Sequence, residues 1–172
     1  MPDPSVTDLP VTDLPVTNLP VARAVLTDPA AEVADTVRLD YDGRLLRRKR
    51  LVGQGGLAFL VDLPELTNLD DHWGLALDDG RAVAIEPAPE ALIEVRGDLA
   101  RLAWHIGNRH TPCQIGTAHL TIRRDPVIEA MLARLGADLA PVTGPFRPEG
   151  GAYGKGRTMG HDHGHTHDHG HG

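Results

Sequence analysis

The sequence contains a single cysteine, Cys113, among 172 residues. A lone cysteine excludes a disulfide within the chain and a zinc site built from four thiolates. Aromatic side chains make up only 3% of the residues, whereas apolar residues make up 41%. We therefore expect a core of aliphatic side chains, in one domain of ordinary size or in two small ones.

Long apolar runs are also missing, so we expect no helix that spans a membrane. The first ten residues, MPDPSVTDLP, lack the basic and apolar segments of a secretory signal peptide. The net charge of −7, with histidines counted as neutral, argues against a general nucleic-acid-binding protein. These absences predict a cytoplasmic protein that binds neither nucleic acid nor membranes.

The N-terminal part of the sequence predicts a disordered leader over 1–20, followed by a small β domain over 21–88. Positions 6–20 carry three copies of a VTDLP repeat, with Asn18 replacing one aspartate. Proline at every fifth position prevents a helix or a central strand there. Apolar runs of strand length follow at 36–40, 57–63, 75–77 and 82–85. Turns containing Asp and Gly separate these runs, as in hairpins.

The segment 89–148 predicts a ferredoxin-like domain with the order β-α-β-β-α-β. Asp98 and Asp125 each precede apolar residues at helical spacing, which predicts two capped helices. Gly107 and Gly136 stand where these helices would end. Short apolar runs precede, separate and follow the helices, so we expect both helices on one face of a four-stranded sheet. The predicted fold class is therefore α+β.

The last segment, 149–172, is rich in glycine and histidine and predicts a flexible metal-binding tail. Every second residue near its end is a histidine, namely His161, His163, His165, His167, His169 and His171. Neutral imidazole binds borderline metals such as nickel, zinc, copper and cobalt. The alternative is a purification tag, although tags are usually uninterrupted and these histidines alternate with Asp, Gly and Thr.

The sequence GNRHTPC at 107–113 is a second candidate metal site. His110 lies just past a predicted helix end, where the helix dipole favours a protonated ring and where we expect an exposed side chain. The His-x-x-Cys spacing could give two ligands to one ion, but Cys113 alternatively packs as a small apolar residue. His119 is predicted to point away from the core, as another ligand or as an ordinary surface residue.

Other motifs give no indication of an enzyme. The GQGG sequence at 53–56 precedes a strand-like run, whereas a dinucleotide-binding loop opens a helix. No nucleophile elbow and no zinc-protease motif occurs. Arg44 and the run 47–50 are basic and could bind an acidic partner or phosphate, but we favour a solvated strand face. We therefore expect no catalytic residue.

Several motifs of the C-terminal half occur together in one order. They are GNRHxP from Gly107, Gln114-Ile115, DPV from Asp125, Met131-Leu132, Leu135-Gly136 and PFxPEGGAY from Pro145. Their combined spacing resembles the urease accessory nickel chaperones, the UreE family, and the resemblance extends over 21–155. It implies a peptide-binding-like β domain followed by a ferredoxin-like metal domain.

The resemblance implies a nickel metallochaperone that delivers Ni²⁺ for assembly of the urease active site. It implies a homodimer joined through the ferredoxin-like domain, in which two copies of His110 share one nickel ion. The tail histidines add ligands or hold further ions, Cys113 and His119 are candidate auxiliary ligands, and zinc or copper can bind in place of nickel. The implied partners are the urease accessory GTPase and the urease apoprotein complex.

Two other functions stay open at this point. One is general storage or buffering of nickel or zinc without a client protein. The other is a peptide-binding co-chaperone that depends on the β domain alone, whose client binding would survive replacement of His110.

Overall fold

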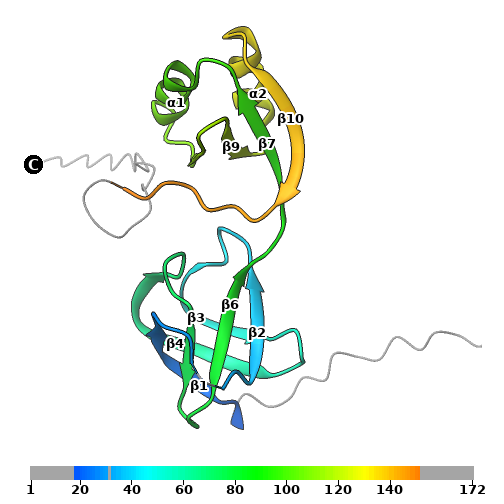
Figure 1. The fold of residues 1–172 in the computed structure, drawn as a ribbon. Helices are drawn as coiled ribbons and strands as arrows, with labels where there is room; N and C mark the ends of the chain where they lie inside the picture. The colour runs from blue at the N-terminus through cyan, green and yellow to red at the C-terminus, as the bar shows by residue number, and fades with distance from the viewer. Residues whose placement is uncertain (1–17, 31, 152–172) are drawn as a thin grey trace, which may run out of the picture.

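The computed structural model describes residues 18–30 and 32–151. Figure 1 shows an N-terminal domain of strands below and a C-terminal domain, which carries both helices, above. The chain passes from one domain to the other between the last strand of the first and the first strand of the second. Within the described ranges, no helix combines the length and the apolar character needed to cross a membrane.

The N-terminal domain consists of six strands: β1 (Val21–Leu26), β2 (Asp35–Leu39), β3 (Leu45–Val52), β4 (Ala58–Asn68), β5 (Gly74–Leu77) and β6 (Ala82–Pro87). They pair in the order β2-β6-β5-β1-β4-β3, with β1–β4 and β2–β6 parallel. The predicted hairpin joins β5 to β6, and Gly80 in its turn adopts a φ of 87°. The expectation of an N-terminal β domain is confirmed.

The core of this domain is mainly aliphatic, as the shortage of aromatic residues predicts. Its buried members are Ala22, Val37, Leu39, Leu46, Leu51, Phe59, Val61, Leu63, Leu69, Leu75, Leu77 and Val83. The apolar run that predicted a buried strand forms β4, in which Phe59 and Val61 are completely buried. Burial of such side chains is the main favourable term in folding.

The C-terminal domain contains β7 (Glu90–Arg96), α1 (Leu99–Gly107), β8 (Gln114–Ile115), β9 (Leu120–Arg123), α2 (Pro126–Arg134) and β10 (Asp138–Gly144). Its antiparallel sheet has the strand order β10-β7-β9-β8. This is the fourth, first, third and second strand of the domain, which is the ferredoxin-like arrangement. The predicted α+β fold class is therefore confirmed, while the histidine tail lies outside the described residues.

Both helices begin at the predicted caps. The Asp98 side chain accepts a hydrogen bond from the amide of Arg101 at 3.3 Å. The Asp125 carboxylate accepts from the amides of Val127 and Ile128 at 2.9 and 3.1 Å. The helices bury one face each in a second core, formed by Ile93, Val95, Leu102, Ile106, Leu120, Ile122, Ile128 and Leu132. The caps thus fix where each helix starts, and the apolar face fixes its orientation.

The chain returns between the two domains after β10. We call residues 145–150 the strap; Figure 1 shows it in orange, crossing from the end of β10 to the side where α1 ends. Phe146 of the strap is completely buried and forms a third apolar cluster with Tyr41 and Leu92. Because Tyr41 belongs to the N-terminal domain and Leu92 to β7, this cluster joins the two domains.

Candidate metal site

His110 stands at the point where the chain leaves helix α1. The amides of Arg109 and His110 donate to the carbonyls of Ile106 and Gly107 at 3.1 and 3.0 Å, which closes the helix in a tight last turn. His110 has a φ of 55°, the one positive value for a residue other than glycine in the described chain. A left-handed conformation is strained for an L-residue, and such strain concentrates at functional sites. The left-handed conformation of His110 turns the chain out of the helix, and the His110 side chain is exposed, as expected.

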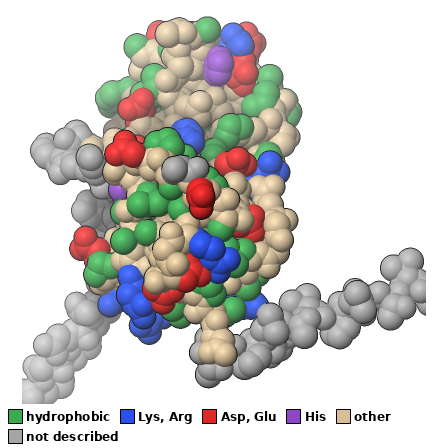
Figure 2. Space-filling view, turned by 60° about the horizontal axis from the view of Figure 1, so that its bottom comes forward, with side chains coloured by type: hydrophobic (Ala, Val, Ile, Leu, Met, Phe, Trp, Pro, Cys, Tyr) green, Lys and Arg blue, Asp and Glu red, His purple; other side chains and the backbone are tan. Residues whose placement is uncertain are grey.

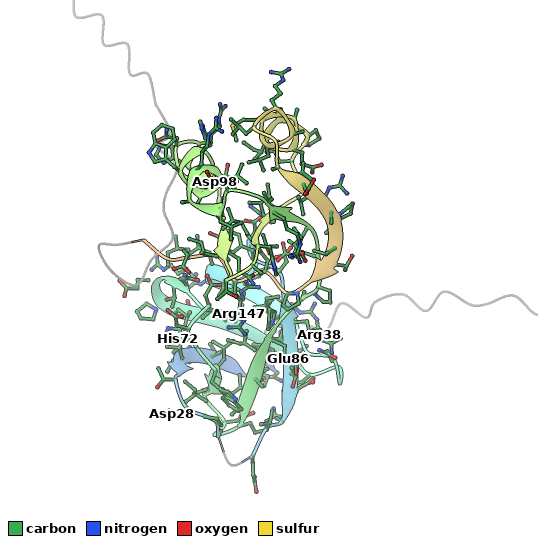
Figure 3. All side chains as sticks on the ribbon, turned by 45° about the horizontal axis from the view of Figure 1, so that its top comes forward. Asp28, Arg38, His72, Glu86, Asp98 and Arg147 are labelled. Atoms are coloured by element: carbon green, nitrogen blue, oxygen red, sulfur yellow. The ribbon has the colours of Figure 1, made fainter. Side chains whose placement is uncertain are left out.

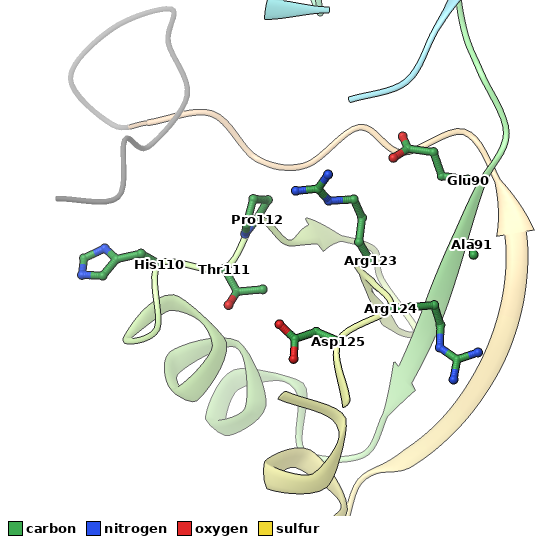
Figure 4. A pocket seen from close by; sticks show the side chains of 8 residues that line it. All are labelled: Glu90, Ala91, His110, Thr111, Pro112, Arg123, Arg124 and Asp125. Carbon is green, nitrogen blue, oxygen red and sulfur yellow. The ribbon is translucent and has the colours of Figure 1, made fainter. Parts of the chain in front are cut away.

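A pocket of about 520 Å³ lies beside His110. Its lining comprises Glu90, Ala91, His110, Thr111, Pro112, Arg123, Arg124 and Asp125. Arg123 pairs with Asp42 at 2.8 Å and Arg124 pairs with Glu129 at 2.9 Å, so carboxylates engage both guanidinium groups. Figure 4 shows the His110 ring pointing outward from the helix end, away from Arg123, Arg124 and Asp125. A ligand bound by the His110 ring would therefore lie away from Arg123, Arg124 and Asp125.

A smaller pocket, of about 190 Å³, lies between His110 and the strap. Cys113, Glu149 and Gly150 contribute to its lining together with His110. Cys113 packs against the core of the C-terminal domain, and burial, together with the nearby Glu149 carboxylate, raises its pKa to about 11. The thiol is therefore protonated at neutral pH, whereas metals bind the thiolate.

His119 precedes β9 on the other side of the sheet from the helices. Its Nδ1 lies 3.9 Å from Glu94 Oε1, so the ring points away from the core, as predicted. The same Nδ1 atom is buried and has no hydrogen-bond partner in the structure. Among the residues that the structure describes, no three side chains of His, Cys, Asp and Glu come together in a way that could hold a metal ion.

The tail histidines predicted as ligands, His161 to His171, lie outside the described residues. The structure shows the position of the strap, the last described segment before these histidines. The amide of Glu149 donates to the carbonyl of Cys113 at 2.9 Å, which fixes the end of the strap beside the loop that carries His110. The chain therefore passes His110 immediately before residue 151, the last described position.

The basic run of the sequence divides into two parts in the structure. Residues 47–50 of β3 are exposed, as expected for a solvated strand face. Figure 2, in which the N-terminal domain faces forward, shows basic and acidic side chains interspersed on this side of the molecule. Ion pairs of the N-terminal domain include Arg23–Asp78, Arg38–Glu86, Arg48–Asp62 and Arg81–Asp79.

The expectation of a solvated side chain is wrong for Arg44, which is only 2% exposed. Arg44 pairs with Asp70 at 2.7 Å and donates a hydrogen bond to the carbonyl of Phe146 in the strap. Asp70 and Phe146 lie 26 and 102 positions further along the chain. Sequence reasoning missed this residue because a pattern of neighbours gives no signal for contacts at such separations.

Comparison with known proteins gives matches over both domains. The model of the UreE urease accessory protein N-terminal domain matches residues 16–88, and that of the C-terminal domain matches 89–171. A urease accessory protein UreE of Rhodobacter capsulatus is 58% identical over 130 residues, covering 76% of this chain and 83% of the relative. Proteins of the same description from Cereibacter sphaeroides and Paracoccus denitrificans are 58% and 57% identical, covering 80% and 79% of this chain and 74% and 87% of the relatives.

Proposed function

Because the chain belongs to the UreE family of urease accessory proteins, we propose that it is a nickel metallochaperone, which delivers Ni²⁺ for assembly of the urease active site and catalyses no reaction itself. The observation that carries this proposal is the exposed His110 ring, held in a strained conformation at a helix end. Imidazole is a good nickel ligand. The chain that continues into six alternating histidines passes directly beside it.

We further propose that the protein works as a homodimer joined through the ferredoxin-like domain. One imidazole per chain is too few for a metal ion, which takes four or more ligands in most protein sites. Two copies of His110 around one nickel ion supply the first two. Three large apolar side chains of this domain, Trp104, Ile115 and Val127, are 63, 54 and 72% exposed, and such surface favours association.

The tail histidines complete the nickel site or hold further ions. These are His161, His163, His165, His167, His169 and His171. His119 and Cys113 are proposed as auxiliary ligands; Cys113 has to lose its proton to bind, so its contribution depends on the metal displacing that proton. Zinc and copper can occupy the same ligands. The proposed partners are the urease accessory GTPase and the urease apoprotein complex, in the cytoplasm.

Nickel titration of four forms of the chain tests the site. They are the full-length protein, a form truncated after Met159, His110→Ala and, as a control on the same helix, His105→Ala. Truncation should lower the number of bound ions and leave a tight site. His110→Ala should weaken that site roughly tenfold or more, by the magnitude usual for groups that hold a metal. The ring of His105 packs edge-on against Trp104, 5.0 Å between centroids, and its removal should leave nickel affinity unchanged.

The opposite pattern would overturn the assignment: loss of all tight binding on truncation, with no effect of His110→Ala. Deletion of the protein from a urease-producing cell separates the functions. A metallochaperone is required for urease activation when nickel is scarce, whereas a storage protein without a client is not. Client binding that persists in His110→Ala without any requirement for nickel would favour a peptide-binding co-chaperone.

A further inference from the structure

The strap is held from both domains. On the side of the C-terminal domain, the amide of Arg147 donates to Gln114 Oε1 at 3.0 Å and that of Glu149 to the Cys113 carbonyl at 2.9 Å. On the side of the N-terminal domain, the Arg147 guanidinium donates to the Asp70 carbonyl at 3.3 Å. Figure 3 labels Arg147 at the boundary between the two domains. The strap is therefore part of the domain interface.

Arg44 is the central contact on the N-terminal side. Its Nε donates to Asp70 Oδ1 at 2.7 Å, its Nη1 to the Leu39 carbonyl at 2.9 Å, and its Nη2 to the Phe146 carbonyl. A buried charge is costly unless it is paired and hydrogen-bonded, and all three nitrogens of this guanidinium have partners. Only the planar fork of arginine can donate in these three directions at once. A lysine at this position would therefore keep the positive charge but could not make all three hydrogen bonds.

An aromatic contact holds the strap at the same point. The Phe146 ring is completely buried and lies 5.4 Å from the Tyr41 ring at an interplanar angle of 67°. Such edge-to-face pairs are favourable beyond the area that they bury. The chain has only two phenylalanines and two tyrosines, and one of each meets here. The carbonyl that Arg44 binds thus belongs to the one buried residue of the strap.

The end of the strap leads to the proposed nickel site. Glu149 and Gly150 line the small pocket that His110 also lines, so the anchored strap brings the start of the tail to His110. If the strap were released, residues 145–150 would be added to the length of chain between the folded domain and the tail histidines. The effective concentration of a tethered ligand falls with about the −3/2 power of tether length, and it falls further when the attachment point moves away.

We propose that Arg44 is a positioning residue for nickel handling: by binding the Phe146 carbonyl, it fixes the strap so that the histidine tail starts beside His110. The inference rests on the proposed function, because it presupposes nickel at His110. It gives the N-terminal domain a part in metal binding through a side chain that does not contact the metal.

The first step of the test measures release of the strap. Arg44→Lys keeps a positive charge opposite Asp70 but loses the fork that also reaches the strap. Arg48→Lys is the matched control, because Arg48 makes an exposed 2.9 Å ion pair with Asp62 on the neighbouring strand. Hydrogen exchange of the Arg147 and Glu149 amides should become roughly tenfold faster in Arg44→Lys. Exchange at both amides should be unchanged in Arg48→Lys.

The second step measures nickel affinity by competition with a chelator. Each variant is titrated at full length and truncated after Met159, and the ratio of the two affinities measures what the tail adds. Arg44→Lys should reduce this ratio about two- to fivefold, as expected for a longer and displaced tether. The truncated forms with Arg44 and with Lys at this position should bind nickel equally. A residue that only stabilised the fold would instead weaken the full-length and truncated forms alike.

Gln114→Ala provides a second route, because it removes the acceptor of the Arg147 amide from the other side of the strap. Gln114→Ala should also reduce the ratio of full-length to truncated nickel affinity. It tests the proposal even if Arg44→Lys folds poorly. An unchanged ratio despite a released strap, or strap amides unaffected by Arg44→Lys, would overturn the proposal. Failure of the nickel function itself has a different signature, namely identical titrations of the wild-type chain and His110→Ala.

Discussion

His110 and Cys113 lie close in the sequence of the candidate site but differ in conformation and burial. The His-x-x-Cys spacing allows both His110 and Cys113 to be ligands, with Cys113 alternatively packing as a small apolar residue. In the structure His110 takes a φ of 55° and is exposed, whereas Cys113 packs into the core of its domain. Burial favours the neutral form of a thiol, while metal binding requires the charged form. The two residues therefore differ in readiness to bind although they are three positions apart.

The raised pKa of Cys113 predicts a thiol that reacts slowly with alkylating reagents. Because burial raises the pKa of the thiol to about 11, the thiolate is scarce at neutral pH. Alkylation by iodoacetamide should be slow at pH 7–8, well below the rate of an exposed thiol, and should rise as the pH approaches that pKa. The rate measured against pH in the folded chain, with the urea-unfolded chain as control, checks this. Equal rates at pH 8 in both states would contradict it.

The loop between β3 and β4 takes its shape from a contact with a residue of another strand. Its GQGG sequence at 53–56 joins two strands and opens no helix, in agreement with the sequence pattern. Asp35, at the start of β2, accepts hydrogen bonds from the amides of Gly55 and Leu57 at 2.8 and 3.0 Å. The bond from Gly55 is the main cause that lowers the pKa of Asp35. The loop is therefore shaped by one carboxylate from another strand.

Close approach to this carboxylate explains why Gly53 has no side chain. A Cβ atom at Gly53 would lie 2.2 Å from Asp35 Oδ2, so Gly53→Ala has to displace the carboxylate from its amide donors. We expect a loss of about 1–3 kcal/mol in the free energy of unfolding, measured by urea denaturation. Gly144→Ala is the control, because a Cβ there meets nothing within 4 Å. Equal stability of the two variants would argue against this role of Asp35.

The stability from Asp35 depends on pH in a definite direction. A carboxyl whose folded pKa lies below its ordinary value stabilises the fold while it is ionised. Its contribution is therefore complete at neutral pH and is lost as the pH falls through the acid range toward the lowered pKa. In Gly53→Ala, where the carboxylate is displaced, the dependence of stability on acid pH should be correspondingly weaker.

At the scale of the whole molecule, two separate cores are joined by one small cluster. The first core belongs to the N-terminal domain and the second to the ferredoxin-like domain. Tyr41, Leu92 and Phe146 form the cluster between them, and Arg44 and the Asp42–Arg123 ion pair lie around it. The two domains are therefore coupled mainly through a few side chains at the strap.

Removal of the aromatic anchor should uncouple the domains. Phe146→Ala deletes a completely buried ring, a change that typically costs about 3–5 kcal/mol. Differential scanning calorimetry should then show two separated unfolding transitions where the wild-type chain shows one. Phe146→Leu, which keeps an apolar side chain in the cluster, should retain a single transition at lower temperature. A single transition in Phe146→Ala would mean that the domains are coupled elsewhere.

The fold was largely predictable because its signals are local. The caps at Asp98 and Asp125, the helical spacing after them and the hairpin turn at Gly80 act over a few residues, and each is found where the sequence predicted it. The position of His110 past a helix end followed from the same signals. The domain bounds at 20, 88 and 148, the homodimer and the tail ligands stay predictions.

The two kinds of domain, the aliphatic cores and the exposed histidine at the end of α1 follow from local patterns in the sequence. The packing of the domains, in contrast, buries Arg44, raises the pKa of the Cys113 thiol and places the end of the strap beside His110. The physical reason is the range of each effect. Periodicity and capping depend on neighbours within one or two turns, whereas Arg44 meets a carbonyl 102 positions away only after both domains have packed.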